Sequence, residues 1–278
     1  TLLLDAIFGN STFLTQCLMR NSQFFFEILK NDPSVTLDFL INGIKWNPKR
    51  VASGTNESAF GNITLKQLMS DLRFARERVA LLIAITDIGN VLPLDQITNN
   101  LSNFADAAIS LATNWLLLNA AEKGDLLLNN NDNPSFRSGF VILALGKLGG
   151  QELNYSSDVD LIALYDQEEI TYVGTESPHD CFCRLTQYLV QILTERTADG
   201  YVFRTDFRLR PDAGATPLAI SMVAAETYYE SVGQNWERAA MIKARPVAGD
   251  WSSGHKFLEQ LSPFVWRKNL DYAAIKDI

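Results

Sequence analysis

Residues 146–162 read GKLGGQELNYSSDVDLI, and this stretch decides what the rest of the chain is expected to form. It follows an apolar run at 140–145, whose length and composition are typical of a buried strand. A second apolar run begins with Asp158 and Asp160, one residue apart. Alternate side chains of a strand share a face, so we expect both carboxylates to point the same way, with Val159 and Leu161 directed into the core.

Two carboxylates on one face of a strand repel each other unless a cation lies between them. Ligand sets made only of oxygen suit Mg²⁺ or Mn²⁺. The preceding glycines, Gly149 and Gly150, would let backbone N–H groups approach a phosphate that the same metal neutralises. The stretch therefore predicts a metal-dependent site for phosphate chemistry.

A third acid, on a neighbouring strand, would complete such a site, and the segment 202–210 supplies Asp206. As a strand, this segment has an apolar face with Phe203, Thr205, Phe207 and Leu209. Its other face is charged, with Arg204, Asp206, Arg208 and Arg210. One acid among three arginines is also compatible with an exposed cross-strand charge ladder. Taken together with Asp158 and Asp160, however, Asp206 favours an active site with three carboxylates.

A glycine turn followed by Asp-x-Asp on a strand resembles the DNA polymerase beta-like nucleotidyltransferases. Longer motifs resemble one family in particular, the glutamine synthetase adenylyltransferases, and they lie at 146–162, 206–211 and 236–245. The resemblance runs from near residue 1 to the end of the chain and is densest between 140 and 250. It implies an α+β fold, in which helical N- and C-terminal regions flank a nucleotidyltransferase core made of a small mixed sheet with helices.

Members of this family carry two catalytic halves in one polypeptide. The motif LNYSSD at 153–158 and the segment 263–272 at the end of the chain resemble the N-terminal half, which removes AMP from glutamine synthetase. The resemblance thus implies phosphorolysis of an adenylylated tyrosine, in which inorganic phosphate enters and ADP leaves. It also implies a PII signalling protein and glutamine as regulatory inputs, acting partly through the other half.

The resemblance further implies roles for individual residues. Asp158 and Asp160 would bridge one or two Mg²⁺ (or Mn²⁺) ions, and Asp206 would bind the ion nearer the nucleophile. Contacts to phosphate would come from Gly149, Gly150 and Ser157. Contacts to phosphate or AMP would come from Arg208, Arg210, Lys243 and Arg245. Each of these four basic residues could instead pair with a local acid such as Glu226 or Glu237.

Composition narrows the function classes. The chain of 278 residues has a net charge of −8, so its surface should repel nucleic acid, and a polymerase role on DNA or RNA is disfavoured. Its three cysteines do not form a disulfide framework, which suits a reducing cytoplasm. No apolar run approaches the roughly 20 residues of a membrane span, so no membrane is expected. The chain begins without methionine, and we expect it to be a fragment of a longer polypeptide.

The first part of the chain, 1–128, is expected to be helical. Two or three short helices are predicted before residue 42, with breaks near Ser11 and Pro33, and a polar loop at 43–62. Longer helices are predicted from Thr64 and from Pro93. The first of these carries Arg73, Arg76 and Arg78, for which a solvated helix face is the favoured explanation over contact with a ligand.

A polar, helix-breaking run at 129–134 leads into the catalytic core, predicted at 134–212. Within it, 178–197 is expected to be the helix between the second and third core strands. The last part, 213–278, is expected to be a helical region after a short extended piece at 217–221. Trp236, in this last part, is expected in the core rather than stacked on a nucleotide.

Two other functions stay open. One is a non-catalytic nucleotide-sensing or docking module, against which the three aspartates argue, because concentrated negative charge gains nothing in a binding-only site. The other keeps the fold but transfers AMP from ATP to glutamine synthetase or to a small molecule. A zinc site at His179, Cys181 and Cys183 is disfavoured, because it offers too few ligands.

Overall fold

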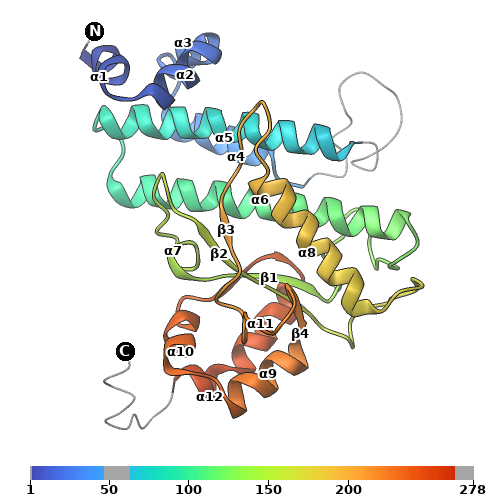
Figure 1. Cartoon of the computed structure of the whole chain (residues 1–278). Coiled ribbons are helices and arrows are strands. Elements are labelled where there is room, and N and C mark those ends of the chain that lie inside the picture. The colour runs from blue at the N-terminus through green and yellow to red at the C-terminus, as the bar shows by residue number, and fades with distance from the viewer. Residues whose placement is uncertain (1, 47–62, 267–278) are drawn as a thin grey trace.

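The computed structural model describes residues 2–46 and 63–266 (Figure 1). In this part of the chain, a series of helices comes first, and a small mixed sheet of five strands with further helices follows. The fold is therefore α+β, as expected. The predicted loop at 43–62 and the closing motif at 263–272 lie largely outside the described residues.

Four short helices come first: α1 (Leu2–Asn10), α2 (Thr12–Arg20), α3 (Ser22–Ile28) and α4 (Pro33–Gly43). Side-chain caps fix two of the starts, because Ser11 accepts a hydrogen bond from an N–H of α2 and Asp32 accepts two from α4. The predicted breaks are confirmed, but there is one helix more than expected. No single helix of the described residues could cross a membrane by length and apolarity; α1 and α2 together would pass that test, yet they meet at a bend of 117°.

Two long helices, α5 (Leu65–Ile88) and α6 (Leu94–Glu122), lie side by side and form most of the helical region (Figure 1). Thr64 caps α5 by accepting a hydrogen bond from the N–H of Gln67, which confirms the predicted start. Both helices bury a wide apolar face. α6 also packs against the sheet, so the helical region and the sheet share one core.

The arginines of α5 do not form the solvated face that was predicted. The guanidinium of Arg73, which is only 1 % exposed, donates to carbonyls at the end of α8 (Pro178–Thr194) and in the loop after it. Arg76 lies over the rings of Phe13 and Tyr201, and Arg78 also lies over aromatic rings. The prediction failed because these carbonyls and several of these rings are distant in sequence from α5.

The sheet consists of β1 (Phe140–Ala144), β2 (Val159–Tyr165), β3 (Thr205–Asp206), β4 (Ala219–Ser221) and β5 (Arg245–Gly249). β1 is antiparallel to β2 on one side and to β5 on the other. β3 and β4 run parallel to β2 along its other edge, β3 at its beginning and β4 at its end. β1 is wholly buried, and so is β2 except at Asp160, which confirms the two strands predicted around the glycine motif.

β5 is a strand that the sequence did not predict. Pro246 within it has no N–H to donate, and the β1–β5 register shifts beside it, between Ile142 and Leu143. A short edge strand with a proline gives no clear alternating pattern. Because β4 and β5 both follow residue 212, the boundary predicted there does not coincide with the edge of the sheet.

The remaining helices are α7 (Gly146–Gly149), α9 (Met222–Ser231), α10 (Asn235–Met241), α11 (Trp251–Gln260) and α12 (Ser262–Val265). Together α9 to α12 form a group below the sheet in Figure 1, with a second apolar core between them and the sheet. α8 lies between β2 and β3 in the chain, as predicted. Trp236 is 49 % exposed at the start of α10, so its prediction as a core residue is wrong.

Candidate active site

The three aspartates of the sequence motifs lie together at the beginning of β2. Asp160 and Asp206 are paired in register across the parallel strands β2 and β3, and Asp158 directly precedes β2. Val159 and Leu161 are fully buried, which leaves Asp160 on the opposite face, as strand alternation predicts. The topology thus joins acids that are far apart in the sequence.

The charges of Asp206 and Asp158 act on the ionisation of Asp160. Burial raises the pKa of Asp160 above its ordinary value, and the charges of Asp206 and then Asp158 raise it further. Arg208 and Lys147 lower that pKa, but the net direction is upward. The negative charge around Asp160 is therefore only partly compensated by the chain itself.

Arginines hold the two outer aspartates. Arg204 donates through Nε to Asp158 at 2.5 Å and through Nη2 to the carbonyl of Ser156 at 2.8 Å. Arg208 donates to both carboxylate oxygens of Asp206, with Nε at 3.0 and 2.9 Å and Nη2 at 2.5 Å. The hydrogen bonds from Arg208 hold the pKa of Asp206 below its ordinary value. Guanidinium groups thus occupy directions from which a cation would approach these carboxylates.

Across residues 2–46 and 63–266, no group of three or more His, Cys, Asp or Glu side chains converges as metal ligands do. Asp158 and Asp206 are instead paired with Arg204 and Arg208. The chemistry of the donors nevertheless fits Mg²⁺ or Mn²⁺, because three carboxylates supply only oxygen ligands. For all three to hold one cation, Arg204 and Arg208 have to turn aside.

The glycine turn packs closely against its surroundings. Gly146 has a φ of +55°, and a Cβ on it would come within 2.5 Å of Oδ2 of Asp160. A Cβ on Gly149 would overlap the main-chain oxygen of Lys243. The N–H groups of Gly149 and Gly150 donate to carbonyls of the same turn, at 2.9 and 3.1 Å. Their contact with phosphate stays a prediction, and it requires these amides to be released from the turn.

Ser157 belongs to a loop that leads into the aspartates. Its hydroxyl donates to the side-chain oxygen of Asn154 at 2.8 Å and accepts from the N–H of Asn154 at 3.1 Å. The neighbouring Tyr155 donates from its hydroxyl to Asp87 of α5 at 2.8 Å. The loop is thus held in shape from both sides, and contact of Ser157 with phosphate stays a prediction.

Two of the four basic candidates have exposed side chains. The side chain of Arg208 is 86 % exposed apart from its pairing with Asp206. Lys243 pairs with Glu152 at 2.6 Å near the surface. Neither pairs with Glu226 or Glu237, the acids named as alternatives; Glu237 instead accepts from Tyr228 and from the N–H of Gln234.

The other two candidates are engaged with the chain. Arg210 donates to the carbonyl of Phe207, three residues before it, and to carbonyls of the loop that follows it, those of Ala213, Thr216 and Pro217. The predicted strand at 202–210 therefore ends at Asp206, where the chain turns. Arg245 makes two hydrogen bonds to the carboxylate of Asp106, at 2.8 and 3.0 Å, and donates to the carbonyls of Leu148 and Gly149. Contact of Arg210 or Arg245 with phosphate or AMP stays a prediction.

Two residues of the site were not named by the sequence analysis as site residues. Arg204 contacts Asp158, and its place on the same strand face as Asp206 was the available signal. Lys147 lies near enough to Asp160 to lower its pKa. It follows the first glycine of the motif, but nothing in the spacing indicated where its charge would act.

The family model for glutamate-ammonia ligase adenylyltransferase matches residues 2–260. The chain belongs to the glutamate-ammonia ligase adenylyltransferase family. It is 53 % identical over 212 residues to the bifunctional glutamine synthetase adenylyltransferase/adenylyl-removing enzyme of Rhizobium meliloti (strain 1021), covering 76 % of this chain and 22 % of that relative. Relatives with the same name from Brucella suis biovar 1 (strain 1330) and Bartonella quintana (strain Toulouse) are 44 % and 45 % identical, each over 99 % of this chain.

The chain spans about a quarter of the length of these relatives, 22 % to 27 %. The family to which it belongs is named for adenylyl transfer, a nucleotidyltransferase chemistry. The names of the relatives include both the addition and the removal of an adenylyl group. The match therefore gives the family and the class of chemistry but does not choose between these two activities.

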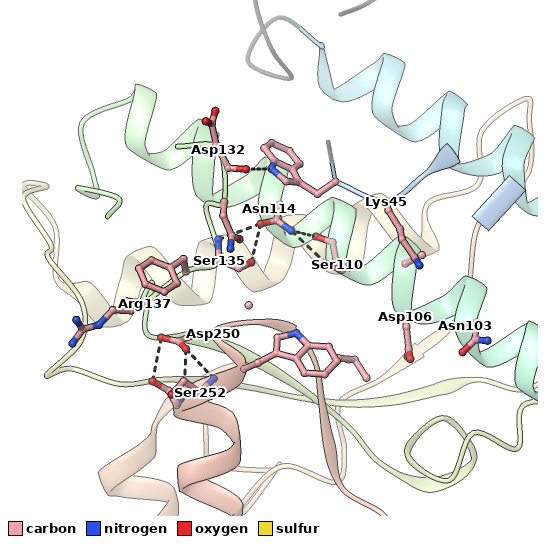
Figure 2. A pocket seen from close by; sticks show the side chains of 18 of the residues that line it. Lys45, Asn103, Asp106, Ser110, Asn114, Asp132, Ser135, Arg137, Asp250 and Ser252 are labelled. Carbon is pink, nitrogen blue, oxygen red and sulfur yellow. Dashed lines mark hydrogen bonds between the residues drawn. The ribbon is translucent and has the colours of Figure 1, made fainter. Parts of the chain in front are cut away.

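Two cavities lie near the site of this adenylyltransferase-family domain. The larger, of about 1110 Å³, lies between α4, α6 and the start of α11, and its polar side chains include Asp106, Asn114, Ser135 and Asp250 (Figure 2). Its connection to the glycine turn is indirect: Asp106 in its wall pairs with Arg245, which donates to the carbonyls of Leu148 and Gly149. The smaller, of about 470 Å³, is bordered by the loop that contains Ser157 and by Arg204, which pairs with Asp158.

Proposed function

We propose that this chain removes AMP from an adenylylated tyrosine of glutamine synthetase by phosphorolysis, with phosphate as co-substrate and ADP as product. The observation that carries the proposal is the in-register pairing of Asp160 with Asp206 beside Asp158. The family membership supports glutamine synthetase as the substrate, and the relatives' names include an adenylyl-removing activity. We propose a DNA polymerase beta-like core at 134–212 after a helical region at 1–128. The region proposed as helical at 213–278 also contributes β4 and β5 to the sheet of that core.

The reaction exchanges one phosphorus–oxygen bond for another. An oxygen of phosphate attacks the phosphorus of AMP, and the bond from that phosphorus to the tyrosine oxygen breaks. Phosphate is already anionic at neutral pH, so it needs little help from a general base. The departing phenolate, whose conjugate acid has a pKa of about 10, does need stabilisation until it takes a proton.

Asp158, Asp160 and Asp206 would hold one or two Mg²⁺ or Mn²⁺ ions. A metal bound there supplies positive charge to the transferring phosphoryl group and to the leaving oxygen. Arg204 and Arg208, turned aside from the carboxylates, would be able to bind the phosphate oxygens.

Around them, Lys243 would bind phosphate or AMP from its exposed position, and Ser157, Gly149 and Gly150 would bind phosphate. We propose that Arg210 and Arg245 act indirectly, by holding the loop after β3 and the glycine turn in place.

In the direct test, the chain is incubated with adenylylated glutamine synthetase, phosphate and Mg²⁺, and the ADP that forms is measured. We expect ADP to form, and Asp206→Asn to reduce its rate by about 100-fold or more. Asp212→Asn is the matched control, because Asp212 is an exposed acid of the following loop with a positive φ that asparagine tolerates. Full turnover in Asp206→Asn would refute the proposed third carboxylate.

The second candidate is transfer of AMP from ATP to glutamine synthetase, which the relatives' names also include. This reaction releases pyrophosphate, which is measured after incubating the chain with ATP and unmodified glutamine synthetase. Pyrophosphate without ADP formation in the first assay would assign this chain to transfer, while nucleotide binding without either product would assign it to sensing. In the longer protein, we expect a PII signalling protein as a partner, a cytoplasmic location, and no role for nucleic acid or membrane.

A further inference from the structure

The cavity of about 470 Å³ lies where the helical region meets the catalytic loop. α2, α5 and α6 supply half of its lining residues, among them the apolar side chains of Phe13, Ala80 and Leu101. The loop at 153–157 and the segment at 201–204 complete it. That segment reaches α5 because the chain between α8 and β3 extends past α6 towards it (Figure 1).

This cavity borders residues that adjoin or contact the acidic cluster. Ser156 and Ser157 line it and directly precede Asp158. Arg204 lines it as well, while donating to Asp158 at 2.5 Å and to the carbonyl of Ser156 at 2.8 Å. A group bound in the cavity can therefore reach Arg204, which is in direct contact with Asp158.

The wall is rich in aromatic rings and offers few free polar groups. Phe203 packs on Phe104 with ring centres 5.8 Å apart. Arg76 lies over the rings of Phe13 and Tyr201, at 5.6 and 5.0 Å from their centres. The polar side chains of the loop are already paired, since Tyr155 binds Asp87 and Ser157 binds Asn154. Such a wall suits an apolar ring better than a base that must be read by hydrogen bonds.

We infer that this cavity binds the side chain of the adenylylated tyrosine, with its neighbouring residues, in the substrate polypeptide. The inference rests on the proposed function. The tyrosine ring packs among the apolar side chains of α2, α5 and α6, and its oxygen points towards Asp158 and Arg204. The guanidinium of Arg204 then lies near the oxygen that becomes a phenolate when the phosphorus–oxygen bond breaks, and favours its departure by its positive charge. The adenine of AMP binds elsewhere.

Filling the cavity tests this inference. Ala80→Phe places a ring inside it, and Ala224→Phe places the same ring on the exposed face of α9 as a control. We expect Ala80→Phe to raise KM for adenylylated glutamine synthetase by about tenfold or more, which corresponds to the loss of one good apolar contact. The dissociation constant of ADP should stay unchanged, and so should both quantities in Ala224→Phe. Phe13→Ala, which removes an exposed part of the wall instead, should also raise KM.

Two outcomes would overturn the inference. Weaker binding of ADP to Ala80→Phe, with an unchanged KM for the protein substrate, would assign the cavity to adenine. Unchanged values for both, in a variant whose melting temperature matches the wild type, would leave the cavity without a substrate role.

A binding measurement separates this inference from the proposed function. A fluorescent peptide with an O-adenylyl tyrosine is titrated against the chain without phosphate, where no turnover occurs. We expect binding that Ala80→Phe weakens and that Ala224→Phe leaves unchanged. Equal binding to wild type and Ala80→Phe contradicts the inference, whether or not the chain forms ADP. Peptide binding at the cavity with no ADP formation from phosphate would contradict only the proposed function.

Discussion

Asp160 has the most unfavourable electrostatic surroundings of the three aspartates, because burial and two neighbouring carboxylates all raise its pKa. A carboxyl group whose pKa is higher in the folded than in the unfolded protein binds more protons when folded. Folding stability then falls as the pH rises through the window between the two pKa values. At neutral pH without metal, the ionised Asp160 therefore destabilises the fold.

From this we predict opposite effects of Asp160→Asn on stability and on activity. In a chelating buffer at neutral pH, the variant should melt at a higher temperature than the wild type, because one repelling charge is gone. Mg²⁺ should raise the melting temperature of the wild type more than that of the variant, and ADP formation should fall by about 100-fold or more. Thermal melts with and without Mg²⁺ check this. A variant that is less stable than the wild type in the chelating buffer would contradict the account of Asp160.

Among the helices and strands, the glycine turn that contains α7 makes the closest backbone contacts of the site. A Cβ on Gly149 would overlap a main-chain oxygen of Lys243, which cannot move without displacing the start of β5. A Cβ on Gly150 would meet the flexible end of the same lysine at 3.0 Å. The two adjacent glycines therefore differ in what they tolerate.

We predict that Gly149→Ala lowers the free energy of unfolding by about 2 to 3 kcal/mol, and that Gly150→Ala lowers it by less than about 1 kcal/mol. The measurement is urea denaturation of both variants beside the wild type. Equal losses of unfolding free energy in the two variants would mean that the backbone around Lys243 moves easily. That result would contradict the close packing of Gly149 against Lys243.

The pairing of Arg245 with Asp106 connects α6, the glycine turn and β5. Both side chains are largely buried, and Arg245 also satisfies the carbonyls of Leu148 and Gly149. We predict that Arg245→Met costs about 2 to 3 kcal/mol of unfolding free energy, because it leaves a carboxylate and two carbonyls without their donor. Arg208→Met, at a far more exposed arginine, should cost much less, because solvent screens its pairing with Asp206. Similar losses in both variants, measured by urea denaturation, would contradict a bracing role for Arg245.

Elements with long or continuous apolar patterns were predictable from the sequence. β1 and β2 are uninterrupted apolar runs, and α5, α6 and α8 repeat their buried positions with helical spacing. β5 was not predictable, because its five residues include Pro246 and its pairing depends on β1, far away in the sequence. The strand at β3 was predicted too long, since the turn after Asp206 is held by Arg210 bonding to carbonyls further along the chain.

For the molecule as a whole, the placement of the candidate acids could be predicted because motif spacing and strand alternation constrain it. The positions of the basic residues could not, since each depends on a partner set by the fold: Arg73 on the end of α8, Arg245 on Asp106, Arg204 on Asp158. The same reason explains why Arg204 was overlooked. Charges on a strand face can be assigned from spacing, but the acid that each arginine meets requires the tertiary structure.

The central claim is that Asp158, Asp160 and Asp206 hold one divalent metal site. The most direct test is to titrate the chain with Mn²⁺ and to measure the unbound ion by electron paramagnetic resonance, which gives the affinity of the site. We predict that the wild type and Asp212→Asn bind Mn²⁺ alike, while Asp206→Asn binds it at least about tenfold more weakly. Equal affinity in Asp206→Asn and the wild type would contradict the claim.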